Sequence, residues 1–205
     1  MRKLLLTGFE PFLHYPKNPT MEIVEALNGQ VIDEIEIVGR TLVVDFNESA
    51  RQFKQIIQDI EPDLIISLGL AGGRAKITPE RIAINVKDGE VDNAGYAPTD
   101  EPIYPNEADG LFSTLPIRPI VNKLREAGYP AEISNTAGTY LCNNIMYEGL
   151  RYAKSKEHIM AGFIHIPADF ELAIANGKIP GWNQQDLLVA VKIAIGQSIE
   201  AFHTK

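Results

Sequence analysis

The sequence predicts an α/β protein in which helices cover both faces of a mostly parallel sheet. Residues 3–6 and 64–68 are almost continuously apolar, as strands are when both faces of a sheet are buried. Amphipathic helical segments alternate with such strands along the chain, which is typical of a sheet whose strands are joined by crossover helices. We therefore expect a three-layer α/β/α sandwich with a twisted central sheet.

Strands are expected where the sequence is apolar or alternates between apolar and polar residues. In chain order they cover residues 3–6, 35–38, 42–44, 64–68, 81–86, 131–134 and 159–166. The first is followed by a loop that carries two aromatic residues, Phe9 and Phe12, and the strand at 64–68 is followed by a glycine-rich turn. Both connections leave the carboxyl end of a predicted strand, where open α/β sheets bind ligands.

Helices are expected where apolar residues recur at helical spacing next to capping residues. In chain order they cover residues 19–27, 46–60, 117–127, 140–154 and 184–202. Asn18 and Pro19 suit the N-cap and first position of a helix, and the segment 46–60 has the most regular apolar face. The polar segment 87–110 is too long for a simple turn, so we expect it to be functional or to contact another subunit.

Composition limits the classes of partner. The chain has 205 residues, 45% of them hydrophobic, which is enough for one domain over residues 1–205. A formal net charge of −8 without a basic run argues against nucleic acid and anionic membranes as partners. One cysteine cannot form an intrachain disulfide, and the apolar run near the N-terminus is too short for a signal peptide. We expect a cytoplasmic protein.

Cys142, the only cysteine, is the candidate nucleophile. It lies in the first turn of the helix expected at 140–154, where unpaired N–H groups and the helix dipole favour a thiolate and can hold an oxyanion. We therefore expect this thiol to ionise easily. The alternative is that Cys142 is a small buried apolar residue, as lone cysteines often are.

Glu80 and His165 complete a catalytic set with Cys142. Each of the three follows, or lies near, the carboxyl end of a predicted strand, so the fold should bring them together. Cysteine-dependent acyl transfer needs a thiol, an imidazole and a carboxylate. The imidazole transfers the thiol proton, and the carboxylate orients the imidazole. His14 is a rival base, whereas His158 and His203 are expected to be solvated.

The glycine-rich turn at 69–73 allows a second interpretation, a phosphate-binding loop in a doubly wound nucleotide-binding domain. No helix is expected directly after the turn, and the Gly-Lys-Ser/Thr sequence of phosphate loops is missing. We therefore interpret these glycines as room for a substrate.

Several motifs, in the same order along nearly the whole chain, resemble the pyroglutamyl peptidase I family of cysteine peptidases. The matching segments are TGFEPF at 7–12, ITPERIAIN at 77–85, FSTLPI at 112–117, TAGT at 136–139 with CN at 142–143, and AGFIHIP at 161–167. The resemblance places the family's catalytic residues on Glu80, Cys142 and His165. It implies a cytosolic homo-oligomer, commonly a tetramer, that uses no metal or cofactor and removes N-terminal pyroglutamate from peptides.

The resemblance also implies a substrate pocket. Phe9 and Phe12 match the aromatic residues that hold the pyroglutamyl ring, and a flat, uncharged lactam suits an apolar slot. Leu70, Tyr140 and Leu141 fall on further substrate-binding positions, although the family usually has Gln at the first and Phe-Val at the other two.

The segment at 88–93 differs most from the family. The family sequence DARIPDN corresponds here to DGEVDN, which is one residue shorter and has no arginine. If the family arginine polarises the scissile carbonyl, this chain lacks that group unless Arg74 replaces it.

Two hypotheses follow from the sequence. The first is an active cysteine exopeptidase that removes N-terminal pyroglutamate, which the joint presence of Glu80, Cys142 and His165 favours. The alternative is a catalytically weak relative that binds lactam-capped peptides or a similar small ligand, which the missing arginine favours.

Overall fold

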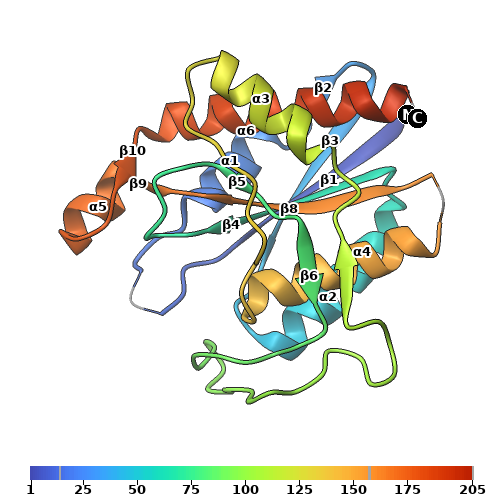
Figure 1. Cartoon of the computed structure of the whole chain (residues 1–205), viewed down its shortest axis with the longest axis vertical. Coiled ribbons are helices and arrows are strands. Elements are labelled where there is room, and N and C mark those ends of the chain that lie inside the picture. The colour runs from blue at the N-terminus through green and yellow to red at the C-terminus, as the bar shows by residue number, and fades with distance from the viewer. Residues whose placement is uncertain (14, 157, 205) are drawn as a thin grey trace.

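The computed structural model describes residues 1–13, 15–156 and 158–204. Its centre is a six-stranded sheet with the order β2-β3-β1-β4-β8-β5 (Figure 1). The strands are β1 (Arg2–Phe9), β2 (Val31–Ile32), β3 (Ile35–Leu42), β4 (Leu64–Leu70), β5 (Thr78–Pro79), β6 (Ile82–Ile84), β7 (Gly110–Phe112), β8 (Met160–Ile166), β9 (Ala168–Asp169) and β10 (Gly181–Trp182). The helices are α1 (Pro19–Leu27), α2 (Phe46–Ile60), α3 (Ile117–Glu126), α4 (Leu141–Lys154), α5 (Phe170–Asn176) and α6 (Gln184–His203).

The sheet is mostly parallel, as the sequence predicts. Strands β3, β1, β4 and β8 run parallel, and short antiparallel strands β2 and β5 form the two edges. β4 is buried along its whole length and β8 likewise, which explains their nearly continuous apolar sequences. The remaining strands form two small pairs outside this sheet, β6 with β7 and β9 with β10.

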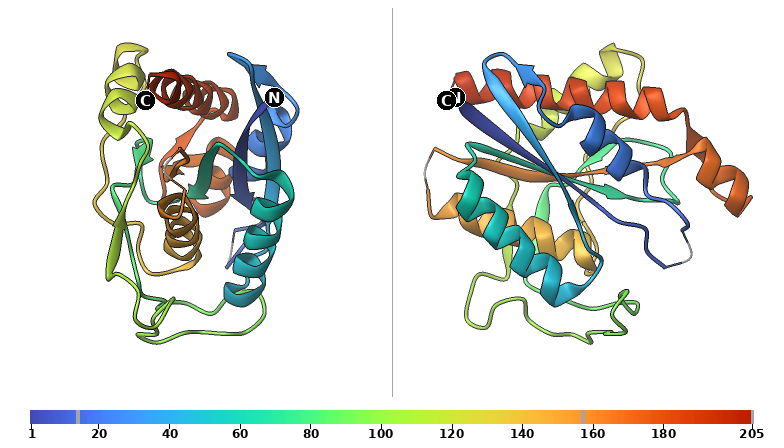
Figure 2. Two further views of the ribbon diagram at one scale, coloured as in Figure 1. Left: turned by 90° about the vertical axis from the view of Figure 1, so that its right-hand side faces the viewer. Right: turned by 180° about the vertical axis from the view of Figure 1, so that it is seen from behind.

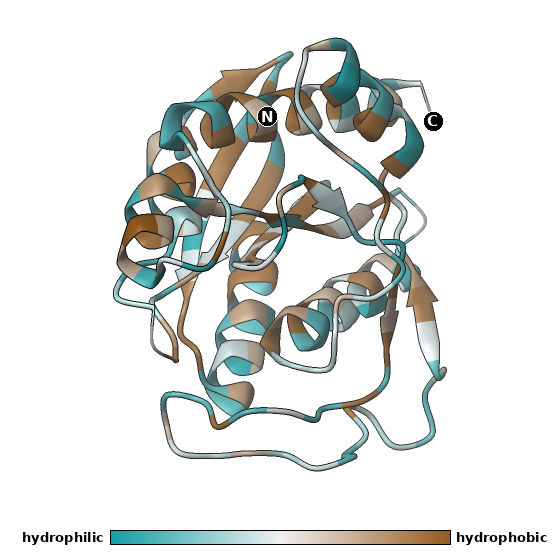
Figure 3. Cartoon of the chain, turned by 60° about the vertical axis from the view of Figure 1, so that its left-hand side comes forward, coloured by the Kyte–Doolittle hydropathy of each residue, from teal (hydrophilic) through white to brown (hydrophobic). Residues whose placement is uncertain are grey.

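Helices cover both faces of the sheet and produce the expected three layers. In Figures 1 and 2, α1, α3 and α6 lie on one face, and α2 and α4 lie on the other. Two hydrophobic clusters fill the space between the layers, one under each group of helices. Successive residues of a strand point to opposite faces, so β8 sends Ile164 and Ile166 into the first cluster and Phe163 into the second. Figure 3 shows apolar strands inside and polar residues along the long segment that follows β6.

Local capping chemistry explains where the helices begin. Asn18, Asp45 and Asn183 are the N-caps of α1, α2 and α6, and each side-chain oxygen accepts a backbone N–H of the first turn. Pro19 occupies the first position of α1, as predicted. At one end of the sheet, the guanidinium of Arg2 at the start of β1 lies over the ring of Phe202 near the end of α6. No helix in the described ranges is long and apolar enough to span a membrane.

Three strand predictions were wrong in detail. In place of the predicted strands at 35–38 and 42–44 there is one strand, β3, because Gly39 to Leu42 continue to pair with β1, and residues 43 and 44 lie beyond its end. The predicted strand at 81–86 is shorter and pairs with β7 rather than with the central sheet. Residues 131–134 are extended but make only isolated bridges, Ile77 to Ala131 and Glu80 to Ser134, so they do not form a regular strand.

The long segment between β6 and β7 is fixed to the body by buried polar groups. The carboxylate of Asp92 is 5% exposed and accepts N–H bonds from Phe46, Ala94 and Tyr96. The hydroxyl of Tyr104 donates to the carboxylate of Glu148 on α4. These contacts hold the segment across the ends of α2 and α4.

Candidate active site

The antiparallel pairing of β5 with β8 brings Glu80 and His165 together. Thr78 pairs with His165, and the backbone N–H of Glu80, directly after β5, donates to the carbonyl of Phe163 at 2.9 Å. His165 lies two residues beyond Phe163 and therefore faces the same side of the sheet, toward α4. The two residues are 85 positions apart in the sequence, and this short strand pair makes them neighbours.

Glu80 holds the imidazole of His165. Oε1 of Glu80 lies 2.7 Å from Nδ1 of His165, and the residues are 0% and 5% exposed. An ionised carboxylate only accepts hydrogen bonds, so Nδ1 carries the proton and Nε2 is left as the basic nitrogen. This is the orientation that a general base needs.

Cys142 is the second residue of α4, as the sequence predicts, and its side chain is partly exposed. Its sulfur lies against β4 at Gly69, the residue that pairs with His165. A Cβ atom on Gly69 would lie 2.8 Å from Sγ and 2.7 Å from the ring of Phe163, so only glycine leaves room here. The structure thus places the thiol, the imidazole and the carboxylate at one edge of the sheet.

Asn143 fixes the N-terminus of α4 next to Cys142. Its fully buried side-chain amide accepts the N–H of Ile84 and donates to the carbonyls of Ile84 and Val86, at 2.8–2.9 Å. The N-cap residue Tyr140 makes no side-chain capping bond. Helix geometry leaves the N–H groups of a first turn unpaired, so those beside Cys142 can bind an anion.

The expectation of an easily ionised thiol was wrong for the unliganded site. Burial raises the pKa of the Cys142 thiol to about 12, and the negative charge of Glu80 also raises it. Arg74 and the thiol's own backbone N–H act in the opposite direction, but they are smaller causes of the pKa shift. The helix N-terminus therefore does not offset the desolvation of the sulfur, and at neutral pH the site holds a neutral thiol.

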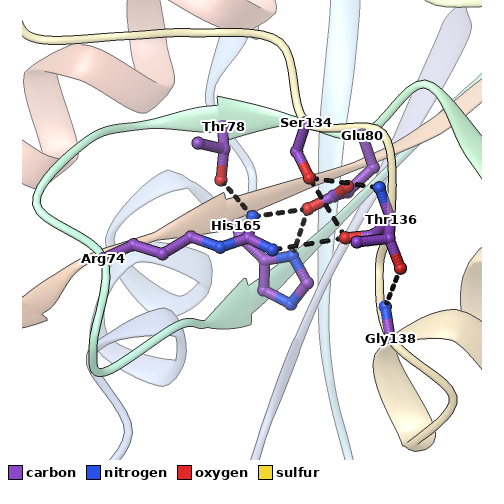
Figure 4. A network of polar contacts seen from close by, with 7 residues as sticks. All are labelled: Arg74, Thr78, Glu80, Ser134, Thr136, Gly138 and His165. Atoms are coloured by element: carbon purple, nitrogen blue, oxygen red, sulfur yellow. Dashed lines mark hydrogen bonds and ion pairs between the residues drawn. The ribbon is translucent and has the colours of Figure 1, made fainter.

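Arg74 contacts both Glu80 and the loop before α4 (Figure 4). Its Nη1 donates to Oε1 of Glu80 and to the hydroxyl of Thr78, each at 2.7 Å, and its Nη2 donates to the carbonyl of Thr136 at 3.2 Å. The sequence did not indicate this role, because it depends on the turn 71–77 folding back over β5.

A narrow apolar slot opens beside the sulfur. Its lining comprises Phe9, Phe12, Asn18, Val44, Leu70, Tyr140, Leu141 and Cys142. The five residues that the resemblance assigns to substrate binding are thus all next to the nucleophile. The slot has a volume of about 10 Å³, which is room for roughly one water molecule. Any larger group must move a lining side chain outward.

Two lining residues, Asn18 and Val44, were not predicted as part of the site. Asn18 was assigned only as a helix cap, which it is, and its Nδ2 also donates to the carbonyl of Glu10. Val44 was assigned to a strand, but it lies just beyond β3 and its N–H donates to the carboxylate of Glu10. Because both residues bond to Glu10 of the TGFEPF motif, that glutamate is the sequence feature that could have placed them in the site.

The segment Asp88 to Asn93, where the arginine of the resembling family is missing, lies along the start of α4. Asp88 exchanges hydrogen bonds with Thr139 at 3.0 and 2.8 Å, and the hydroxyl of Tyr140 donates to the carbonyl of Val91 at 3.2 Å. The Nδ2 group of Asn93 donates to Glu10 and to the carbonyl of Pro11. The segment therefore ties the loop that carries Phe12 to the helix that carries Cys142.

The other histidines do not compete with His165 in the described structure. His158 and His203 are exposed, and His203 contacts Arg2 and the carbonyl of Asp33 near the termini. His14 lies outside the described residues. Within the described residues, no cluster of three or more His, Cys, Asp or Glu side chains could hold a metal ion.

Comparison with known proteins identifies close relatives. A family model described as pyroglutamyl peptidase matches residues 2–201. The chain is 65% identical over 201 residues to a pyrrolidone-carboxylate peptidase of Lysinibacillus sphaericus, covering 98% of both chains. It is 51% identical over 197 residues to one of Oceanobacillus iheyensis, covering 96% of this chain and 98% of the relative.

Solved structures agree with this match. The pyrrolidone carboxyl peptidase of Thermococcus litoralis superposes with a TM-score of 0.96 at 36% identity, over 100% of this chain and 96% of that one. A mutant pyrrolidone carboxyl peptidase from Pyrococcus furiosus gives a TM-score of 0.95 at 42% identity, over 98% and 99% of the two chains.

The raised thiol pKa predicts the pH dependence of alkylation. Only the thiolate reacts with iodoacetamide, so the rate in the unliganded protein should rise nearly tenfold per pH unit from pH 6 to 9 without a plateau. The measurement is the rate of mass increase of the intact chain, which has a single cysteine. A Cys142→Ser variant controls for reaction elsewhere, and a plateau below pH 7 would show a stable thiolate instead.

Proposed function

This chain belongs to the pyroglutamyl peptidase family of cysteine peptidases, and we propose that it removes N-terminal pyroglutamate with Cys142 as nucleophile, His165 as general base and Glu80 as orienting carboxylate. The observation that carries these assignments is the 2.7 Å contact from Glu80 to His165 beside the sulfur-bearing N-terminus of α4. Each group has the chemistry that its role requires.

In the first half of the reaction, the Sγ–H proton passes to Nε2 of His165 while sulfur attacks the pyroglutamyl carbonyl. The resting thiol is neutral, so proton transfer accompanies the attack rather than preceding it. Glu80 stabilises the imidazolium that forms. When the carbon–nitrogen bond breaks, His165 gives the same proton to the leaving amine, and a thioester with Cys142 remains.

In the second half, His165 takes a proton from water as the water attacks the thioester. The carbon–sulfur bond breaks, the proton returns to sulfur, and free pyroglutamate leaves. In both halves the carbonyl oxygen becomes an oxyanion, and the unpaired N–H groups at the start of α4 are the donors that can hold it.

We assign recognition of the lactam ring to Phe9, Phe12, Leu70, Tyr140 and Leu141. Their side chains make an apolar slot, and a lactam is flat and carries no charge. Because the unliganded slot has a volume of only about 10 Å³, we expect at least one lining side chain to move outward when the ring enters. Phe12 is the candidate, since it lies on the connection after β1 and is only partly buried.

The weakly catalytic alternative is not favoured. The relatives that the chain matches over nearly its full length are named peptidases, and a protein that only binds a ligand has no need of a buried carboxylate that orients a histidine next to a thiol. The absence of the family arginine does not by itself remove any of the three groups assigned above.

We place the enzyme in the cytoplasm, because a nucleophilic thiol must stay reduced and the cytosol maintains free thiols. We also propose that residues 1–205 act as one domain, since the two hydrophobic clusters lie on opposite faces of the same sheet. By family resemblance the chain assembles as a homotetramer. Phe112 on β7 and Phe170 and Ile174 on α5 are 67%, 53% and 82% exposed, and subunit contacts would cover such apolar side chains.

The first prediction tests the nucleophile and base. Cys142→Ser should abolish hydrolysis of a pyroglutamyl amide with the fold intact, because a serine hydroxyl is a far weaker nucleophile in a site built for sulfur. His165→Ala should lower kcat by about two to four orders of magnitude. His158→Ala, at an exposed histidine, is the control. Turnover is measured with a fluorogenic amide. Undiminished turnover by Cys142→Ser or His165→Ala would refute the proposed mechanism.

The second prediction concerns specificity. Pyroglutamyl, prolyl and glutaminyl amides of one fluorescent amine should differ strongly in kcat/KM, with cleavage of the pyroglutamyl substrate only. A prolyl ring has the same size but brings an unpaired cation into the apolar slot and lacks the ring carbonyl. Comparable cleavage of the prolyl amide would refute the lactam slot. Binding of a pyroglutamyl ligand without cleavage of any substrate would restore the weak-relative hypothesis.

The third prediction concerns assembly. Light scattering at micromolar concentration should give about four times the chain mass of 22.7 kDa. Ile174→Glu places a charge on the most exposed of the large apolar side chains and should reduce the measured mass. A strict monomer for the wild-type chain is the result that would contradict a tetramer.

A further inference from the structure

We propose that Arg74 is a positioning residue that pairs with the buried Glu80 carboxylate, keeps it aimed at His165, and ties it to the loop leading to Cys142. This inference rests on the proposed function, because it concerns the same three residues. It assigns to Arg74 a role through Glu80, rather than the contact with the substrate carbonyl that the family arginine suggested.

One carboxylate oxygen is shared between Arg74 and His165. Oε1 of Glu80 accepts from Nη1 of Arg74 and from Nδ1 of His165, each at 2.7 Å (Figure 4). Nη1 also donates to the hydroxyl of Thr78, which fixes the guanidinium over β5. Any shift of Arg74 therefore moves the atom that orients the imidazole.

The Glu80 carboxylate is buried beside a single cationic side chain, Arg74, within the described residues. Its side chain is 0% exposed, and its second oxygen, Oε2, has no hydrogen-bond partner within the described residues. The titratable groups that face Glu80 are Arg74 from the turn after β4, His165 from β8 and Cys142 from α4. Of these, only Arg74 is positively charged while His165 is neutral, so it alone offsets the cost of burying the carboxylate.

The same guanidinium reaches the loop that precedes α4. Nη2 of Arg74 donates to the carbonyl of Thr136 at 3.2 Å. That carbonyl also accepts the hydroxyl of Ser134 at 3.0 Å, and the Thr136 hydroxyl accepts the N–H of Gly138 at 3.1 Å. The loop is thus closed on itself two residues before the N-cap of α4, and Arg74 connects it to Glu80.

These contacts leave Arg74 poorly suited to polarise the scissile carbonyl. Both of its terminal nitrogens already donate to acceptors within the chain, and its side chain is 33% exposed. Moving it to a substrate would leave the Glu80 carboxylate buried without its cation. Its effect on the reaction therefore passes through Glu80 and His165.

The test compares Arg74→Ala and Arg74→Lys with Arg81→Ala. Arg81 is the matched control, because its Nε donates at 2.7 Å to the side chain of Asn135 in the same loop while its contacts do not include the Glu80 carboxylate. Hydrolysis of pyroglutamyl 7-amido-4-methylcoumarin is measured from pH 5 to 9, with circular dichroism to confirm folding. If Arg74→Ala does not fold, Arg74→Lys is compared with Arg81→Ala instead. Lysine keeps the positive charge but cannot donate from two nitrogens at once, as Nη1 and Nη2 of Arg74 do.

We expect Arg74→Ala to lower kcat about 10- to 100-fold with little change in KM, as for other residues that orient a catalytic side chain. Without the guanidinium, Oε1 of Glu80 loses one of the two donors that hold it, so the imidazole of His165 is less firmly oriented. Arg74→Lys should lie in between, and Arg81→Ala should stay within about twofold of wild type. Added guanidinium ion should restore part of the lost activity of Arg74→Ala.

Two results separate this inference from the proposed function. No turnover by the wild-type chain would refute the proposed function. Wild-type turnover together with an unchanged kcat in Arg74→Ala would refute the inference alone, and a raised KM at constant kcat would instead make Arg74 a substrate-binding residue. Alkylation provides a readout independent of turnover. Arg74 lowers the pKa of the Cys142 thiol. Iodoacetamide should therefore react more slowly with Arg74→Ala than with Arg81→Ala. Equal rates would contradict an effect of Arg74 on the thiol.

Discussion

The buried carboxylate of Glu80 connects most parts of the site. It follows β5, whose antiparallel pairing with β8 sets it beside His165, and its backbone bridges to Ser134 on the other side. Because a buried charge is stable only when it is paired, the fold must also supply Arg74. One short edge strand therefore fixes the carboxylate, the imidazole, the arginine and the extended segment that leads to α4.

The state of the thiol follows from this arrangement. Burial and the nearby carboxylate both raise the pKa of Cys142, and they outweigh the N-terminus of α4. The charge of Glu80 thus disfavours a thiolate in the resting site, yet it favours the imidazolium that forms during attack.

The slot that we assign to the substrate is built by elements that are distant in the sequence. Phe9 and Phe12 come from the end of β1 and the connection after it, Leu70 from the end of β4, and Tyr140 and Leu141 from the start of α4. The segment Asp88 to Asn93 binds both the first and the last of these regions. The long segment after β6 therefore supports the slot through backbone and side-chain hydrogen bonds, even though it contributes no side chain to the lining.

Local sequence alone determined the features that depend on short-range chemistry. Asn18 and Asp45 cap their helices, the apolar period from 46 to 60 forms α2, and the apolar runs form β1 and β4. The element order also indicated that Glu80, Cys142 and His165 would lie close together, although the strand expected before Cys142 does not form. Tertiary structure decided the rest. Contacts between residues far apart in the chain decide whether 81–86 joins the main sheet and whether 131–134 forms a strand. They also decide which cation pairs with Glu80 and how far the thiol is desolvated. Long-range pairing and the desolvation of a single polar group carry no periodic signal in a single sequence, so only the folded chain reveals them.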